Sequence, residues 1–288
     1  MAIAKVPVSS TVKDLRTRVA RWRRGGERVA LIPTMGALHE GHLELVRIAK
    51  RHCDRVITSI FVNPAQFAPT EDFDKYPRTF EDDLAKLATV EGDLVWAPNK
   101  SEMYPDGFAT KVIPAGTADS LETHFRPHFF GGVATVCCKL FMQALPDIAV
   151  FGEKDYQQLC VIRQMVRDLD LPLQIVGAET VREPDGLAMS SRNRYLSAEE
   201  RAKAVTIHHV IKSVAAAAAQ DTGLDKALVE GRAALTKGGF GAIDYLTVCD
   251  ADTLKDWIRA SGRPGRVLAA AWLGKTRLID NVAVPGAG

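Results

Sequence analysis

The stretch from Val29 to His42 constrains the fold of this chain more than any other. It begins with the apolar run Val-Ala-Leu-Ile, which predicts a short buried strand. We expect Pro33 and Gly36 to end that strand, because neither residue suits a central strand. The run His39-Glu40-Gly41-His42 then leads directly into a helical pattern of apolar residues. Two histidines three residues apart therefore stand where a strand is followed by a helix, and they share one face of that helix.

The start of the expected helix offers a phosphate-binding environment. The first turn of a helix has unpaired backbone N–H groups and a partial positive charge, and both favour an anion. Gly41 leaves room for a ligand to approach the backbone closely. The pattern favours a site that holds a nucleoside triphosphate while charge develops on its phosphates. Zinc is disfavoured, because His-x-x-His supplies only two ligands and no cysteine or third histidine stands nearby at metal-like spacing.

Alternating strand and helix patterns predict an α/β fold for the first part of the chain. Strands are expected over residues 29–32, 55–62, 94–97, 148–151 and 173–176, and helices over 11–24, 79–91, 132–145 and after His42 and Gln158. A strand, a helix and a second strand at this spacing form a βαβ unit, which pairs its strands in parallel. The sequence therefore predicts a doubly wound parallel sheet.

The pattern changes after a turn at Pro184-Asp185-Gly186. Ser197 and Glu200 form a capping box that opens a long helix through Ala219, and a second helix is expected over 224–235. Shorter strands are expected over 243–248, 266–271 and 277–279. The sequence thus predicts two domains: residues 1–182 with the parallel sheet, and a smaller α+β domain over residues 183–288.

Polar side chains that follow the expected strands are candidate ligand contacts, because ligands bind at the carboxyl ends of strands in such sheets. Gln66 follows the second strand and can donate and accept hydrogen bonds to a small hydroxylated substrate, although a solvated loop glutamine explains it equally well. Lys154 stands at a helix start, where the helix dipole disfavours a cation, and such a misfit hints at function. Gln158 lies one turn further along that face. The run Ser190-Ser191-Arg192 can surround a phosphate with two hydroxyls and a guanidinium.

Composition excludes several classes of function. The chain has 288 residues, 47% hydrophobic and 25% charged, with a net charge of +2, so a nucleic-acid partner is not expected. No apolar run approaches membrane-spanning length and no signal peptide is recognisable, so we expect no membrane association. The five cysteines are odd in number and lack a Cys-x-x-Cys pair, which predicts free thiols and a cytoplasmic protein.

Together, the motifs resemble one enzyme family. His39-x-Gly-His42 resembles the signature of the nucleotidyltransferase superfamily. Six segments are similar, in order and over nearly the whole chain, to the pantothenate synthetase family of pantoate–β-alanine ligases: P-T-M-G-A-L-H-E-G-H, S-I-F-V-N-P-A-Q-F, Y-P-R-T, F-G-E-K-D-Y-Q-Q-L, D-G-L-A-M-S-S-R-N-R-Y-L-S and A-A-W-L-G-K-T-R-L-I-D-N. One departure is Pro127 to Val133, where the family more often has Gly-His-Phe-x-Gly-Val.

The resemblance implies a fold, a reaction and a set of site residues. The implied fold is a Rossmann-like domain for ATP and pantoate with a C-terminal lid, as a homodimer. The implied reaction joins pantoate to β-alanine with ATP and Mg²⁺, through a pantoyl adenylate, and gives pantothenate, AMP and pyrophosphate. The implied catalytic residues are His42, His39, Lys154, Ser191 and Arg192. The implied ATP contacts are Met35, Gly36, Ala37, Leu38, His39, Glu40, Gly41, His42, Gly152, Glu153, Lys154, Asp155, Val181, Met189, Ser190, Ser191 and Arg192. Gln66 and Gln158 would hold pantoate, and Asp82 would bind Mg²⁺, although an acid at a helix start more often serves the helix dipole.

Three other functions compete with this interpretation. A small adenylyltransferase would use the same site to leave a dinucleotide, but the two glutamines favour a small polar acid. An aminoacyl-tRNA synthetase would need an anticodon-binding domain and a basic surface, and neither is recognisable. A non-catalytic nucleotide-binding module would have no need for both histidines together with Lys154 and Arg192.

Overall fold

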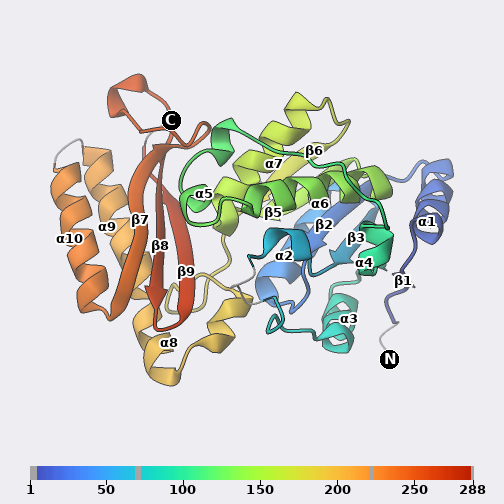
Figure 1. Cartoon of the computed structure of the whole chain (residues 1–288), viewed down its shortest axis with the longest axis horizontal. Coiled ribbons are helices and arrows are strands. Elements are labelled where there is room, and N and C mark those ends of the chain that lie inside the picture. The colour runs from blue at the N-terminus through green and yellow to red at the C-terminus, as the bar shows by residue number, and fades with distance from the viewer. Residues whose placement is uncertain (1–4, 69–72, 221–222, 287–288) are drawn as a thin grey trace.

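A computed structural model describes residues 5–68, 73–220 and 223–286 of the chain. Within them, six strands form one parallel sheet in the order β1-β4-β3-β2-β5-β6 (Figure 1). These strands are β1 (Val8–Ser9), β2 (Val29–Thr34), β3 (Arg55–Ile60), β4 (Leu94–Trp96), β5 (Ile148–Gly152) and β6 (Gln174–Ala178). The chain runs from β2 towards one edge of the sheet and from β5 towards the other, so the strand order reverses between β2 and β5. In sheets of this kind, ligands bind outside such a reversal point.

Helices cover both faces of the parallel sheet because both faces of its strands are apolar. Leu31 faces a core shared with α1 (Val12–Arg24), α6 (Phe129–Ala144) and α7 (Tyr156–Asp168), whereas Ala30 and Ile32 face α2 (Glu40–His52) and α3 (Phe80–Thr89). Successive strand residues point to opposite faces, so each continuous apolar run fills two cores. The short helices α4 (Lys100–Met103) and α5 (Glu122–Phe125) lie in the segment before α6.

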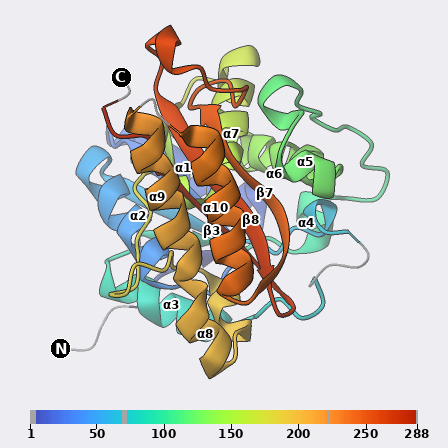
Figure 2. The same ribbon diagram turned by 90° about the vertical axis from the view of Figure 1, so that its left-hand side faces the viewer.

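Residues 240–283 build a second, antiparallel sheet. It consists of β7 (Phe240–Asp250), β8 (Gly265–Leu273) and β9 (Thr276–Ala283). The helices α9 (Thr206–Gln220) and α10 (Leu224–Lys237) pack on one face of it, as Figure 2 shows, and share its core. The opposite face looks towards the parallel sheet (Figure 1). The two sheets with their helices confirm the predicted fold class.

Two of the differences from the expectation concern β2 and the helix that begins after Ser197. Pro33 lies inside β2, beyond Ala30 and Leu31 where β2 pairs with β5, so its missing N–H interrupts no hydrogen bond on that side. The expected helix over 197–219 is divided into α8 (Ala198–Ala204) and α9, which are separated at Val205. Its start is correct, because Ser197 and Glu200 form the predicted capping box. None of the described helices is long and apolar enough to cross a membrane.

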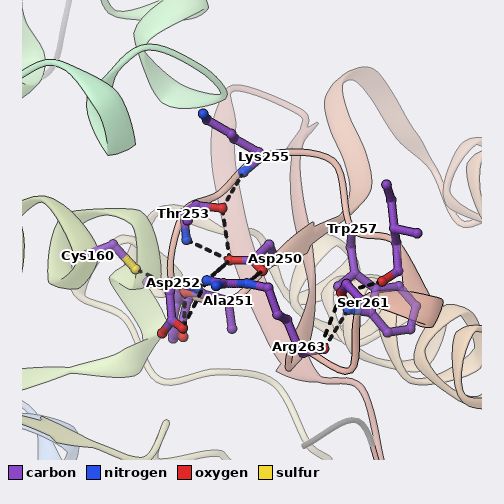
Figure 3. Close-up of polar contacts among 11 residues, drawn as sticks. Cys160, Asp250, Ala251, Asp252, Thr253, Lys255, Trp257, Ser261 and Arg263 are labelled. Atoms are coloured by element: carbon purple, nitrogen blue, oxygen red, sulfur yellow. Dashed lines mark hydrogen bonds and ion pairs between the residues drawn. The ribbon is translucent and has the colours of Figure 1, made fainter.

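The connection between β7 and β8 fastens the second sheet to α7 (Figure 3). The Asp250 carboxylate accepts hydrogen bonds from the Thr253 N–H (2.8 Å) and hydroxyl (2.9 Å) and forms an ion pair with Arg263. This turn presents the Ala251 carbonyl to the first turns of α7. There it accepts from the Tyr156 hydroxyl (3.0 Å) and the Cys160 thiol (3.5 Å). The contact holds the antiparallel sheet beside the first turn of α7, which contains Gln158 and follows Lys154.

Candidate active site

A cavity of about 700 Å³ lies at the carboxyl ends of β2, β3 and β5, between this edge and the antiparallel sheet. It collects most of the predicted site residues from segments far apart in the sequence. Those that line it are Met35, His39, Gly41, His42, Gln66, Gly152, Lys154, Asp155, Gln158, Val181, Met189, Ser190, Ser191 and Arg192. Those that do not are Gly36, Ala37, Leu38, Glu40, Glu153 and Asp82. The cavity occupies the point where the strand order of the parallel sheet reverses.

The loop between β2 and α2 owes its shape to a residue that the sequence interpretation missed. Gly36 and Ala37 both have positive φ angles, +82° and +52°, and the second is unusual for a residue with a side chain. The Asp83 carboxylate holds this conformation by accepting from the N–H groups of Ala37 (2.9 Å) and Leu38 (2.8 Å). Asp83 lies on the buried face of α3 with Leu84 and Leu87, a helical spacing that could have marked it in the sequence.

The two histidines at the start of α2 pack against each other with ring centroids 4.1 Å apart and ring planes tilted by 44°. The His39 N–H donates to Nδ1 of His42 (3.3 Å), so the neutral His42 ring carries its proton on Nε2 and can donate it to a ligand oxygen. Burial, with a contribution from Lys154, lowers the pKa of His39 to about 4. Burial likewise holds the pKa of His42 well below its usual range, with contributions from His39 and Lys154. Both rings are therefore neutral hydrogen-bonding groups near pH 7.

Gly41 is needed because the His39 ring lies over it. A Cβ at position 41 would stand 2.9 Å from Cε1 and 3.0 Å from Nδ1 of that ring. Glu40 points elsewhere and forms an ion pair with Arg47 (2.5 Å). The sequence prediction was that Gly41 leaves room for a ligand; in the structure the His39 ring occupies the space beside its Cα, and the ligand contact stays a prediction.

Lys154 enters the cavity from the short turn Glu153–Asp155 that joins β5 to α7. Within the described residues its ammonium has no hydrogen-bond or ion-pair partner, so its charge is available to a ligand. The backbone beneath it is fixed from the antiparallel sheet, because the Asn281 side-chain amide donates to the carbonyls of Glu153 and Lys154 (both 2.9 Å). The Glu153 side chain pairs with Arg266 (2.9 Å), which explains why it does not line the cavity.

The run Ser190-Ser191-Arg192 enters the short helical turn Ser191–Tyr195 from an extended Ser190. Ser191 is buried, and its hydroxyl lies 3.3 Å from that of Tyr76, which comes from the segment after β3. The Met189 N–H donates to the Val181 carbonyl (3.0 Å), which draws both predicted ATP contacts to the same wall. Hydroxyl donors and the Arg192 guanidinium thereby join the histidines around one cavity.

The two predicted substrate glutamines both reach the cavity. Gln66 is buried, and its Nε2 lies 3.2 Å from the Met35 sulfur. Gln158 is partly buried on α7, while its neighbour Gln157 is a structural residue that binds the carbonyls of Thr117 (2.9 Å) and Ser120 (2.8 Å). Gln157 and Gln158 therefore differ in role. In the described part of the chain, the Gln157 amide is hydrogen-bonded within the protein, whereas the Gln158 amide has no such bond and is available to a ligand.

The divergent segment 127–133 supports the Gln66 turn through Gly132. A Cβ on Gly132 would lie 2.3 Å from the Ala65 carbonyl oxygen and 2.7 Å from the Gln66 nitrogen. Only glycine lets α6 approach the backbone at Ala65 and Gln66 this closely. Phe129, Phe130 and Val133 of the same helix line the cavity and give that wall an apolar surface.

The antiparallel sheet completes the cavity with residues that the sequence reasoning did not single out. Trp272, Tyr245 and Arg277 line it, and the last two meet Glu122 from the other side. The Glu122 carboxylate accepts from the Tyr245 hydroxyl (2.7 Å) and pairs with Arg277 (2.8 Å). Burial, followed by Glu122, raises the pKa of Tyr245, so its hydroxyl stays a donor. The segment A-A-W-L-G-K-T-R-L-I-D-N contains two of these residues, but periodicity predicted only strands there.

Metal-binding groups are sparse in this site. Asp82 is exposed on the first turn of α3 and lies outside the cavity lining. In the described ranges, no cluster of three or more histidine, cysteine, aspartate or glutamate side chains could hold a metal ion. Mg²⁺ usually keeps several waters and binds one or two carboxylates plus substrate phosphates. The donor set therefore fits an ion that is bound mainly by a triphosphate, and not an ion enclosed by protein ligands. Asp155, next to Lys154, offers a carboxylate in the cavity lining.

Comparison with known proteins identifies one family over nearly the whole chain. A sequence model of the family described as pantoate-beta-alanine ligase matches residues 7–283. The pantothenate synthetase of Mesorhizobium japonicum is 56% identical over 283 residues, covering 98% of this chain and 99% of that protein. The one from Caulobacter vibrioides is 56% identical over 279 residues, covering 95% and 97%.

Solved structures are similar over the same length. The crystal structure of pantothenate synthetase from Thermus thermophilus superposes with a TM-score of 0.89 at 44% identity, covering 97% of this chain and 99% of that one. Pantoate-beta-alanine ligase from Francisella tularensis, crystallised with beta-gamma ATP and beta-alanine, gives a TM-score of 0.81 at 30% identity and covers 98% and 100%.

Proposed function

The chain belongs to the pantoate–β-alanine ligase family, and from that premise and its cavity we infer that it condenses pantoate with β-alanine, using ATP. The products are pantothenate, AMP and pyrophosphate. One observation carries this conclusion: a single cavity joins His39, His42 and Lys154 with Ser191 and Arg192, and places Gln66 and Gln158 beside them. The first group suits a triphosphate and the glutamines suit a small acid that carries hydroxyl groups.

The first step activates the acid. A carboxylate is a poor electrophile, so an amine does not displace its oxygen directly. We propose that a pantoate carboxylate oxygen attacks the α-phosphorus of ATP while the bond to the β-phosphate breaks and pyrophosphate leaves. Negative charge grows on the phosphate oxygens, and preorganised donors stabilise it. His42 Nε2–H, His39, the Lys154 ammonium, Ser191 and Arg192 are the donors proposed for this task.

The second step uses the mixed anhydride. The free amine of β-alanine attacks the acyl carbon, the bond from that carbon to the phosphate oxygen breaks, and AMP leaves with the electron pair. The amine nitrogen loses a proton to water as the amide forms. No side chain needs to become covalently attached, which agrees with a cavity whose cysteine thiol, Cys137, is buried and has its pKa raised to about 12 by burial.

We propose that Mg²⁺ binds together with ATP, on its triphosphate. When bound to the triphosphate it would neutralise charge on the leaving pyrophosphate. The exposed position of Asp82 gives its predicted metal contact no support from the cavity lining, so this role stays a prediction. A homodimer likewise stays a prediction from family resemblance, and light scattering measures it. A cytoplasmic location is proposed because all five cysteines are free thiols.

The competing functions predict different products. The decisive experiment incubates the purified protein with ATP, pantoate, β-alanine and Mg²⁺ and identifies every product by mass spectrometry. We expect equal amounts of pantothenate, AMP and pyrophosphate, and none without pantoate. A dinucleotide would indicate an adenylyltransferase, and tight ATP binding without turnover would indicate a binding module.

A further inference from the structure

A chain of hydrogen bonds reaches Gln66 from a residue outside the cavity lining. The Tyr104 hydroxyl, at the end of α4, donates to Oδ1 of Asn63 (2.7 Å). Nδ2 of Asn63 donates to Oε1 of Gln66 (3.1 Å). Asn63 and Gln66 are 1% and 8% exposed and both line the cavity, whereas Tyr104 does not. These two hydrogen bonds therefore link the α4 segment to the Gln66 side-chain amide, which lines the cavity.

The orientation of the Asn63 amide is fixed by backbone groups that cannot exchange roles. Its Oδ1 also accepts from the Ala65 N–H (3.3 Å), and its Nδ2 also donates to the Gly132 carbonyl (3.2 Å). Turning the amide over would place its oxygen against that carbonyl and its NH₂ group against the Ala65 N–H. Oδ1 must therefore face Tyr104, and Nδ2 must face Gln66.

The orientation of Gln66 follows from that of Asn63. Its Oε1 is engaged by Nδ2 of Asn63, which leaves Nε2 to face the cavity beside the Met35 sulfur. Sulfur is a weak acceptor and yields readily to a stronger one. Gln66 thus presents N–H donors, which recognise the carboxylate or hydroxyl oxygens of a ligand and not its donor groups.

Tyr104 is well placed to maintain this arrangement. Its ring packs between Phe61 and Phe108, with centroid separations of 6.2 and 5.1 Å. Burial raises the pKa of its hydroxyl to about 12, so it stays a proton donor near pH 7. Without this donor, Oδ1 of Asn63 would keep only its longer contact with Ala65.

We propose that Tyr104 is a positioning residue for the acid substrate: through Asn63 it holds the Gln66 amide with its donors towards the cavity, and so sets the affinity for pantoate but not for ATP. The proposal rests on the proposed function, since it takes pantoate as the acid. It assigns Tyr104 no contact with substrate.

Calorimetric binding of pantoate and of ATP tests the proposal in the wild type, Tyr104→Phe, Gln66→Ala and the double variant. Tyr104→Phe keeps the ring and removes one hydrogen bond, worth about 1 kcal/mol, so we expect about five-fold weaker pantoate binding and unchanged ATP binding. In the Gln66→Ala background the same change should have no further effect, because the group being positioned is gone. Thr135→Val is the matched control: it removes a hydroxyl that contacts Val112 (3.0 Å) outside the cavity, and should leave pantoate binding unchanged.

Each other outcome has a definite meaning. Equal pantoate affinity in the wild type and Tyr104→Phe, or equal losses with and without Gln66, would overturn the proposal. If Tyr104→Phe does not fold, Gln66→Glu tests the donor orientation that the proposal requires, because it replaces the NH₂ donor by an oxygen. Unchanged pantoate affinity in that variant would overturn the donor orientation and, with it, the proposal. Failure of the wild type itself to bind pantoate would instead refute the proposed function.

Discussion

At the residue scale, charge state separates the histidines from Lys154. His39 and His42 are neutral near pH 7 because burial opposes their protonation, so they can orient and donate without adding charge. In the proposed reaction, the Lys154 side chain would supply positive charge beside the departing pyrophosphate. The sequence predicted all three residues from their positions at helix starts, but it could not predict that the rings are neutral, since burial depends on the tertiary structure.

The lowered histidine pKa values predict how stability depends on pH. Histidine in an unfolded chain has a pKa of about 6.5, whereas burial lowers the pKa of folded His39 to about 4. Between these values the unfolded chain binds a proton that the folded chain does not, so the free energy of unfolding should fall as the pH is lowered from about 6.5 to about 4. Urea unfolding at several pH values measures this, and His39→Gln should show a shallower fall. An equally steep fall in that variant would contradict the assigned pKa.

At the element scale, the helices and strands near the site followed from hydrophobic periodicity, while the loops that carry the chemistry did not. Helix α1 and strand β3 begin within a residue of their predicted positions, because their apolar patterns are regular. The conformation at Gly36 and Ala37 was not predictable, because Asp83 imposes it from a helix more than 40 residues later. The division of the long helix at Val205 and the short strand β1 were also missed, since neither has a marked sequence signal.

Two adjacent aspartates allow a matched test of the loop. Asp83→Asn leaves one of the Ala37 and Leu38 N–H groups facing an NH₂ group, and an unsatisfied buried donor costs about 1–3 kcal/mol. We expect lower stability and weaker ATP binding, measured by urea unfolding and calorimetry. Asp82→Asn changes an exposed side chain and should alter stability by less than about 0.5 kcal/mol.

The same pair also tests the metal prediction. If Asp82 helps to bind Mg²⁺, Asp82→Asn should raise the Mg²⁺ concentration needed for half-maximal activity. An unchanged Mg²⁺ requirement would remove Asp82 from the site. Equal stability and ATP affinity in Asp83→Asn and the wild type would remove Asp83 from its role in the loop.

At the scale of the whole molecule, the cavity exists only where the two sheets meet. The pair Glu122–Arg277 (2.8 Å) joins α5 to β9, and Arg266 joins β8 to Glu153 (2.9 Å). Asn281 holds the Lys154 backbone from the same side. The sequence predicted a second sheet but not its contacts, because pairs more than 100 residues apart leave no periodic signal.

Removing Arg277 should loosen this junction. Its side chain is 13% exposed and those of Glu122 and Asp244 are each 8% exposed, so Arg277→Ala removes the cation that lies closest to two buried carboxylates, at a cost of about 3–5 kcal/mol. We expect a lower unfolding midpoint and faster proteolysis of the native protein. Arg167→Ala is the control, because Arg167 pairs with Asp168 at the surface. Similar stability losses in both variants would argue against a junction that depends on Arg277.

If the protein forms a pantoyl adenylate before β-alanine binds, it exchanges pyrophosphate with ATP in the absence of that amine. Labelled pyrophosphate should enter ATP when the protein, pantoate and Mg²⁺ are present and β-alanine is absent. Exchange should vanish without pantoate, and it should fall at least about 10²-fold in His42→Ala, the scale seen when one transition-state donor is removed. Lys154→Ala should lose it as well. Exchange that requires β-alanine would contradict an adenylate formed before the amine binds, and would indicate a concerted reaction. Release of ADP and phosphate would refute nucleotidyl transfer altogether.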